Sequence, residues 1–325
     1  MCDSIQDGFY DENLHIVSIF VVFIGSGTGI LLPLLPEIIL KNNISSYKQT
    51  LIKNLTFYCK WFGSGVILAT SLVHLLFDAF NALSPNCINL TYEPLSALIV
   101  LCSLLFVLVI DFSLARLMYR RRLKFTQTTR ENAATGDAAD GEGQEEKNEK
   151  DLKRMQKIQA HADILIIEAG IVFHSVIVGL TLGVATEPGF VALFIAIVFH
   201  QACDGLAIGS RMAELSYKGK RVQQVMMIVA YSLITPIGIA IGIGVKHSFD
   251  PTNVSTKLAI GILDSIASGV LLYGAVVDVL AKECFGTGGE TGKPGLLDAS
   301  NIEVAFAFGA LLLGAGIMSL LGHWA

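Results

Sequence analysis

The sequence lacks several features that mark common classes of protein. Its six cysteines are scattered and no two form a CxxC pair, so neither a thiolate zinc motif nor a disulfide framework is indicated. The first forty residues contain no Lys or Arg, and residues 3–12 carry four acidic side chains, which is the wrong charge for a cleaved signal peptide. The glycine-rich string at residues 25–29 lies in an apolar run with no strand before it, so it is no nucleotide motif and ATP coupling is not expected. The net charge of −5 indicates no nucleic-acid partner.

Apolar residues dominate instead. They make up 53% of the 325 residues, and the mean hydropathy is +0.60, which excludes an ordinary soluble domain. The apolar runs lack the alternation of a membrane barrel, and we expect the first of them to be retained as a span. The sequence therefore predicts an all-α integral membrane protein with eight transmembrane helices. The expected spans are 14–40, 57–80, 94–118, 161–184, 190–213, 222–245, 257–281 and 301–324.

The basic residues predict the orientation of these spans. The connections after the first, third, fifth and seventh spans contain all of the 23 Lys and Arg residues except Lys246 and Lys257. Positive charge accumulates on the cytosolic side of membrane proteins. We therefore expect both termini to be extracytosolic.

Three parts of the chain differ in composition. Residues 1–124 contain the first three spans after a short extracytosolic N-terminus, and residues 161–325 contain the other five. Residues 125–160 are acidic between them, and 130–150 hold no aromatic residue, so this segment cannot bury a core and is expected to be a disordered cytosolic loop. Its carboxylates could gather cations or it could be modified, but its composition favours a solvated linker.

The fourth and fifth spans carry the polar residues of greatest interest. His174 and Ser175 lie in one, and His200, Gln201 and Asp204 lie in the other. Ionisable groups in the bilayer are costly and commonly functional. Both histidines are expected near mid-bilayer at about 1.5 Å rise per residue, and the short turn at 185–189 makes the two helices antiparallel neighbours.

The spacing of these residues suits a transition metal. His200 and Asp204 are four residues apart and share a helical face, and a GxxxG pattern in each helix would let His174 approach them. Imidazole nitrogen and carboxylate oxygen are zinc ligands, and two His with one carboxylate also suit Fe²⁺. Water or Gln201 could complete the shell, with Ser175 as a weak contact. A lone buried His is more often structural, but two at matched depth favour a metal.

Other polar residues lie along the same path. His74 and Asp78 share a face at the outer end of the second span and could form an outer entrance, or be interfacial polar residues. Glu168, with His161 and Asp163 before it, could form a cytosolic release route, or hydrogen-bond within the bundle. The same alternatives apply to the aspartates of the third and seventh spans, Asp111, Asp264 and Asp278.

The segments His174–Gly183 and His200–Gly209 resemble the fourth- and fifth-helix signatures of the ZIP (Zrt/Irt-like) transporter family. The resemblance extends to residues 74–78, 235–242 and the C-terminal LLGHWA, and covers essentially all eight spans. It implies uptake of a divalent metal into the cytosol through His174, His200 and Asp204. It also implies a 3+2+3 inverted-repeat bundle, an elevator-like movement of helices 1, 4, 5 and 6, and a homodimer.

The sequence departs from this family in three respects. Asp204 stands where the family usually has Glu, which could alter metal preference. The places that hold a second ion in some relatives are Val178, Gln201 and Thr235 here, so one ion is expected. The cytosolic loop contains no His between 125 and 160, unlike the His-rich loop of many relatives.

Function is therefore expected to be metal transport, with no enzymatic activity and no resident cofactor. Zn²⁺ is the expected substrate, with Fe²⁺, Mn²⁺ or Cd²⁺ as alternatives, and the expected location is the plasma membrane or else an organellar membrane. The alternative is an intramembrane metallohydrolase, in which the same metal would activate water and Glu168 would be its acid or base. A metal-sensing receptor would need signalling domains for which the loop is too short and too polar.

Overall fold

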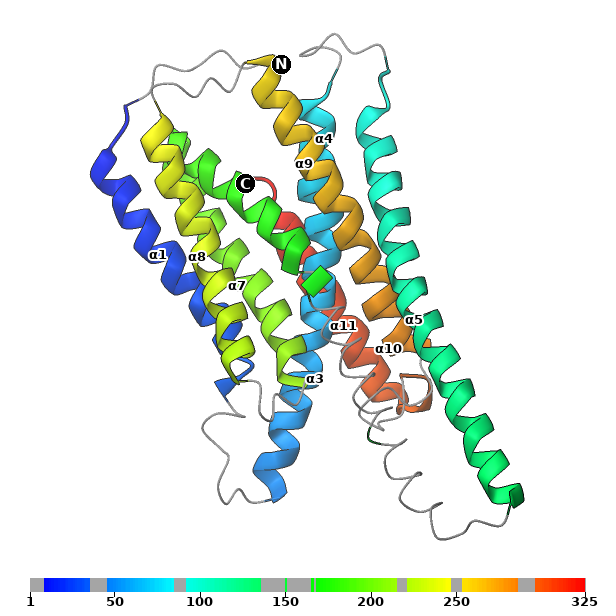
Figure 1. The fold of residues 1–325 in the computed structure, drawn as a ribbon. Helices are drawn as coiled ribbons and strands as arrows, with labels where there is room; N and C mark the ends of the chain where they lie inside the picture. The colour runs from blue at the N-terminus through cyan, green and yellow to red at the C-terminus, as the bar shows by residue number, and fades with distance from the viewer. Residues whose placement is uncertain are drawn as a thin grey trace.

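The computed structural model describes residues 9–35, 46–84, 92–135, 150, 165–166, 168–214, 221–246, 253–285 and 296–324. These residues contain helices and turns and no strand. Seven helical segments among them are long and apolar enough to cross a membrane: Glu12–Leu31, Asn54–Ala82, Leu95–Leu117, Phe190–Ala213, Gln224–Val245, Val254–Val277 and Asn301–Leu321. The predicted all-α membrane class is thus confirmed (Figure 1).

The helical elements follow the expected order along the chain. They are α1 (Glu12–Leu31), α3 (Ser46–Ala69), η1 (Thr70–Leu76), α4 (Phe77–Ala82), α5 (Leu95–Thr135), α7 (Phe190–Glu214), α8 (Arg221–Val245), α9 (Val254–Tyr273), η2 (Gly274–Ala281), α10 (Lys282–Phe285), η3 (Leu296–Asp298) and α11 (Asn301–Leu321). The fourth expected span is represented by the shorter apolar helix Glu168–Val184, and residues 161–164 and 167 lie outside the described ranges.

The bundle is apolar outside and partly polar inside. Large apolar side chains are exposed on its outer helices, for example Phe106 at 67%, Phe199 at 58% and Leu312 at 68%. An exposed apolar surface of this kind is expected where helices face lipid. The buried set instead includes three histidines and two aspartates close to the centre, His74, His174, His200, Asp204 and Asp264.

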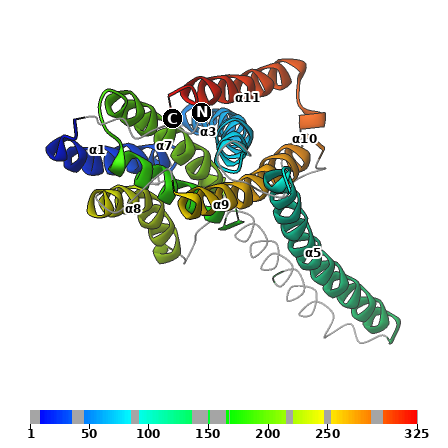
Figure 2. The same ribbon diagram turned by 90° about the horizontal axis from the view of Figure 1, so that it is seen from above.

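The helices form two groups that α3 joins, and Figure 2 shows them from above. On one side α1 packs against α7 and α8, and on the other α5 packs against α9. Helix α3 joins them because it packs against both α11 and α7. The helix Glu168–Val184 contacts α9 through Gly170, which lies against Leu271.

The glycine patterns pack differently from the prediction. We expected them to bring the helix Glu168–Val184 and α7 together, and this is wrong. A Cβ on Gly183 would lie 2.5 Å from the carbonyl oxygen of Ile239 on α8, and one on Gly205 would lie 2.8 Å from the nitrogen of Ile30 on α1. A small-residue stripe permits close approach of backbones but does not specify which helix approaches.

Two spans contain π-helical segments, η1 and η2. The helix Asn54–Ala82 stays continuous through η1, in which His74 lies. A π-helical segment widens the turn and rotates the residues that follow it, and such segments are frequent at functional sites.

Helix α5 is longer than predicted. It runs from Leu95 to Thr135, so residues 125–135, which we expected to begin the disordered loop, are helical, and in Figure 1 this end of α5 extends beyond its neighbours. Extending an existing helix avoids the cost of nucleating a new one, which explains why polar residues continue it. Residues 136–149 and 151–164 lie outside the described ranges.

Residues at and just before the start of α1 form hydrogen bonds with residues 183–187, which connect the helix Glu168–Val184 to α7. The Glu187 nitrogen donates to the carbonyl oxygen of Phe9 at 3.0 Å, and the Tyr10 hydroxyl donates to that of Gly183 at 2.9 Å. The His15 Nε2 lies 3.0 Å from the carbonyl oxygen of Ala185. These contacts fix α1 to the beginning of α7.

Candidate metal site

His200 and Asp204 lie on one face of α7, as their spacing predicted. Nε2 of His200 is 3.2 Å from Oδ2 of Asp204, and both side chains are at most 2% exposed. Despite this distance the two atoms do not have the orientation of a hydrogen bond, and neither has another hydrogen-bond partner. When Nδ1 of His200 carries the ring proton, Nε2 has a lone pair and could bind a cation together with Oδ2 of Asp204.

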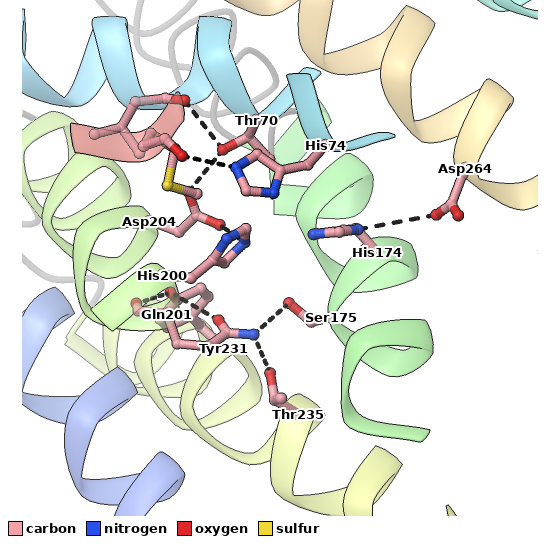
Figure 3. A network of polar contacts seen from close by, with 12 residues as sticks. Thr70, His74, His174, Ser175, His200, Gln201, Asp204, Tyr231, Thr235 and Asp264 are labelled. Atoms are coloured by element: carbon pink, nitrogen blue, oxygen red, sulfur yellow. Dashed lines mark hydrogen bonds and ion pairs between the residues drawn. The ribbon is translucent and has the colours of Figure 1, made fainter. Parts of the chain in front are cut away.

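His174 approaches His200 from the helix Glu168–Val184. The two ring centroids are 5.3 Å apart, and both nitrogens of His174 are buried without a hydrogen-bond partner. On its other side, Nδ1 of His174 lies 3.9 Å from Oδ1 of Asp264 on α9. The ring thus stands between α7 and α9 (Figure 3).

His74 belongs to the same cluster. Its ring centroid is 5.0 Å from that of His200, and its Nε2 lies 2.9 Å from the carbonyl oxygen of Met318, to which it must donate. In a neutral imidazole the other nitrogen, Nδ1, then carries the lone pair. We expected His74 at an outer entrance; its ring lies against that of His200, and it belongs to the π-helical segment η1, for which the sequence shows no signal.

Asp78 lies one helical turn beyond His74 and is only partly buried. Its carboxylate interacts electrostatically with Asp264 and His174. It therefore lies near the cluster without joining the central contacts, and its role at an outer entrance stays a prediction.

Thr70 holds the other oxygen of Asp204. Its hydroxyl lies 3.3 Å from Oδ1 of Asp204 and 3.0 Å from the carbonyl oxygen of Val66. This contact orients the carboxylate so that Oδ2 faces His200. Thr70 was not among the expected site residues, because a Thr in an apolar helix usually bonds its own backbone.

Gln201 and Ser175 lie in a neighbouring hydrogen-bond network (Figure 3). The Gln201 amide nitrogen donates to Thr235 Oγ1 at 2.5 Å and to Ser175 Oγ at 3.3 Å. The Tyr231 hydroxyl lies 2.5 Å from the Gln201 carbonyl oxygen and 3.2 Å from its Oε1. Both expected residues are therefore close to the histidines, but their polar atoms bond to α8 and to each other.

The expected release residues are only partly described. Glu168 is 6% exposed, and its Oε2 is buried without a hydrogen-bond partner. It precedes His174 by six residues, or about 9 Å along the helix axis. His161 and Asp163 lie outside the described residues.

The cluster has the donor set for Zn²⁺ but is open in this conformation. Its unpartnered buried atoms are Nδ1 and Nε2 of His174 and His200, Oδ2 of Asp204 and Oδ1 of Asp264. Buried polar atoms are nearly always bonded to protein or to ordered water, and a group of this composition also suits a bound cation. In the part of the chain that the structure describes, no three His, Cys, Asp or Glu side chains are gathered closely enough to hold an ion. The side chains would have to close around one.

Comparison with known proteins covers nearly the whole chain. A family model described as "ZIP Zinc transporter" matches residues 12–322. Zinc-regulated transporter 1 of Candida albicans is 32% identical over 316 residues, which are 97% of this chain and 62% of that protein. Zinc transporter 3 of Arabidopsis thaliana is 31% identical over 95% of this chain and 84% of its own length. Zinc-regulated transporter 1 of Saccharomyces cerevisiae is 31% identical, with 97% and 89% covered.

Proposed function

The chain belongs to the ZIP zinc transporter family, and we propose that it carries Zn²⁺ into the cytosol through a site formed by His174, His200 and Asp204. It is a multi-pass membrane protein and not an enzyme. The relatives above are named as zinc transporters. What this chain adds is a polar cluster with the ligand types that Zn²⁺ prefers.

The observation that carries the proposal is the group of buried nitrogen and oxygen atoms without partners. His200 Nε2 and Asp204 Oδ2 are 3.2 Å apart, close to the separation of two ligands on one ion bound at about 2.0–2.2 Å. His174 would have to move towards them, because its ring centroid is 5.3 Å from that of His200. Burial of such atoms costs free energy unless a bound group compensates for the lost hydration, and a Zn²⁺ ion would do so.

His74 is the fourth ligand in this proposal. Its Nε2 faces Met318, which leaves Nδ1 for the ion. A carried ion must also leave, so binding has to be strong enough to replace water and weak enough to release. A cluster that closes only in one conformation meets both requirements.

The basic residues predict how the chain is oriented in the membrane, and the membrane potential predicts the direction in which the ion moves. With eight spans and the basic connections in the cytosol, both termini are extracytosolic, and Asp78 lies at the outer entrance. The membrane potential then favours inward movement by about 2.3 kcal/mol per charge per 100 mV. Glu168, with His161 and Asp163, would receive the ion on the cytosolic side.

Alternating access in this proposal moves the first, fourth, fifth and sixth spans of the 3+2+3 inverted-repeat bundle as a unit. Close glycine contacts support this grouping: Gly183 lies against α8, and Gly205 lies against α1. Inverted repeats with a mid-membrane site are typical of such carriers. We extend the proposal to a homodimer in the plasma membrane.

One ion is carried at a time in this proposal. The places that would hold a second are Val178, Gln201 and Thr235, and the last two are hydrogen-bonded to each other. Zn²⁺ is the main substrate. Asp204 has one methylene group fewer than the usual Glu, and we propose that this changes the preference relative to Fe²⁺, Mn²⁺ and Cd²⁺.

An intramembrane metallohydrolase is not favoured. It would need an acid or base within hydrogen-bond reach of the metal-bound water, and Glu168 is about 9 Å from His174 along the helix. The expected candidates on the cytosolic side therefore fit ion release better than chemistry.

The test is accumulation of radioactive zinc in cells that lack their own uptake system. Cells with the wild-type chain should accumulate zinc, and His174→Ala and His200→Ala should reduce this by at least about tenfold at equal amounts in the membrane. His323→Ala is the matched control, because His323 is exposed near the C-terminus. Uptake by His174→Ala and His200→Ala equal to that of the control would overturn the proposal.

A further inference from the structure

Asp264 is a buried carboxylate that is not among the proposed metal ligands. It lies on α9, and its side chain is 4% exposed. Oδ1 has no hydrogen-bond partner, and the group in ion-pair range within the described residues is His174, at 3.9 Å. A buried charge without a partner is expensive, so this carboxylate needs an explanation of its own.

The packing of α9 directs Asp264 towards the site. Ser268, four residues later and on the same helical face, donates to the carbonyl oxygen of Ser71 in η1 at 2.9 Å. This bond fixes α9 against the segment that carries His74. Asp264 is thus held by its helix beside the cluster and is not free to turn towards lipid.

The ring of His174 separates Asp264 from the centre of the site. Figure 3 shows one ring nitrogen directed at Asp264 and the other directed at the side of His74 and His200. The nitrogen that faces Asp264 is Nδ1. Asp264 therefore reaches a bound ion through His174 and does not touch the ion itself.

We propose that Asp264 is the positioning carboxylate of His174: it accepts a hydrogen bond from Nδ1–H, so that Nε2 presents its lone pair to the transported ion. The inference rests on the proposed function. A metal-binding His usually donates its second N–H to a carboxylate or carbonyl, which fixes its tautomer and makes the ligating nitrogen more basic. The distance of 3.9 Å is too long for a hydrogen bond. Because His174 moves away from Asp264 when it approaches His200, the side chain of Asp264 has to follow the ring for the hydrogen bond to form.

The experiment compares Asp264→Asn with a matched control, Asp111→Asn. Asp111, at the interface of α5 and α9, accepts a hydrogen bond from Tyr273 at 2.8 Å. Of the two roles offered for it, this bond fits hydrogen bonding within the bundle and not ion release. Zinc uptake is measured against zinc concentration at equal surface amounts. Asp264→Asn should raise the apparent KM for zinc by about 10- to 100-fold, and Asp111→Asn should leave it within about twofold of wild type.

Two further variants distinguish positioning from a merely structural role. Asp264→Glu keeps the acceptor and should have a KM nearer to wild type than Asp264→Asn. If Asp264→Asn fails to reach the membrane, Asp264→Ser takes its place in the assay. Its side chain is also neutral but smaller, and it should raise the apparent KM for zinc as expected for Asp264→Asn. A structural role would instead lower the unfolding temperature of the purified zinc-free protein and leave KM unchanged, which would overturn the inference.

His174→Ala in the same assay separates this inference from the proposed function. If His174→Ala loses uptake and the Asp264 variants match Asp111→Asn, then the inference on Asp264 is wrong and the His174 site stands. If His174→Ala keeps wild-type uptake, both are wrong.

Discussion

The imidazole rings of His74 and His200 lie 5.0 Å apart, centroid to centroid, at an angle of 82°. They come from η1 and α7, and the two segments are distant in the sequence. This contact makes His74 a member of the central cluster, whereas Asp78, one turn further along the same span, is partly exposed.

The positions of His74 and Asp78 predict different effects on zinc uptake. His74→Ala removes a nitrogen from the centre and should raise the apparent KM for zinc by about tenfold or more. Asp78→Asn removes charge at the entrance and should mainly slow ion entry, with a dependence on ionic strength. Ser71→Ala in the same π-helical segment is the control, because its hydroxyl bonds to Leu68. Equal effects of His74→Ala and Asp78→Asn would place both at the entrance.

Asp204 should determine how well the site accepts different ions. Asp204→Asn removes the charge that faces His200 and should reduce zinc uptake on the order of 10- to 100-fold. Asp204→Glu should keep uptake and change the order in which Fe²⁺, Mn²⁺ and Cd²⁺ compete with radioactive zinc. Cys203→Ala is the control at the adjacent position. An identical competition order for wild type and Asp204→Glu would show that the shorter carboxylate does not affect selectivity.

Two glycines of α8 give a matched pair for stability. A Cβ on Gly242 would lie 2.6 Å from the carbonyl oxygen of Leu180, while one on Gly244 would meet nothing within 4 Å. Gly242→Ala should therefore destabilise the purified protein by about 1–3 kcal/mol through overpacking, and Gly244→Ala should not. Thermal unfolding in detergent measures the difference. Equal unfolding temperatures would contradict the close packing of α8 on the helix Glu168–Val184.

The contact of Tyr10 with Gly183 should contribute to stability over a wide pH range. Burial, and secondarily the Glu12 carboxylate, raise the pKa of Tyr10 above its ordinary value. The contribution is therefore complete below the unfolded-state pKa of about 10 and is lost only as the pH rises through the folded-state value. Tyr10→Phe should cost about 0.5–1.5 kcal/mol.

Unfolding of Tyr10→Phe at several pH values below 9 checks this, with Tyr92→Phe as the control because Tyr92 is 53% exposed. A cost that disappears between pH 5 and pH 9 would contradict the assignment, because the phenol keeps its proton throughout that range.

The local part of this site could be predicted from the sequence, and the long-range part could not. Apolar runs indicated the spans, and the four-residue spacing placed His200 and Asp204 on one face. Nothing in the sequence marked η1 or the contact between the rings of His74 and His200, so His74 was not expected in the central cluster. Asp264 was recognised as an intramembrane aspartate, but its contact with His174 depends on how α9 packs against its neighbours.

The glycine stripes show the same limit. The sequence identified faces lined by small residues on the helix Glu168–Val184 and on α7. Close approach to such a face requires only a helix whose backbone is accessible. Ile30 of α1 and Ile239 of α8 meet that requirement. The assembly of the whole bundle decides which helix packs against a face of small residues, and the glycine pattern alone does not.

X-ray absorption at the zinc edge of the purified, zinc-loaded protein tests the central claim most directly. We expect one bound Zn²⁺ per chain, ligated by imidazole nitrogen and carboxylate oxygen at about 2.0–2.2 Å, with fewer imidazoles in His174→Ala and in His200→Ala. A sulfur ligand at about 2.3 Å, for which Cys203 lies beside Asp204, or a spectrum unchanged in both variants would contradict it.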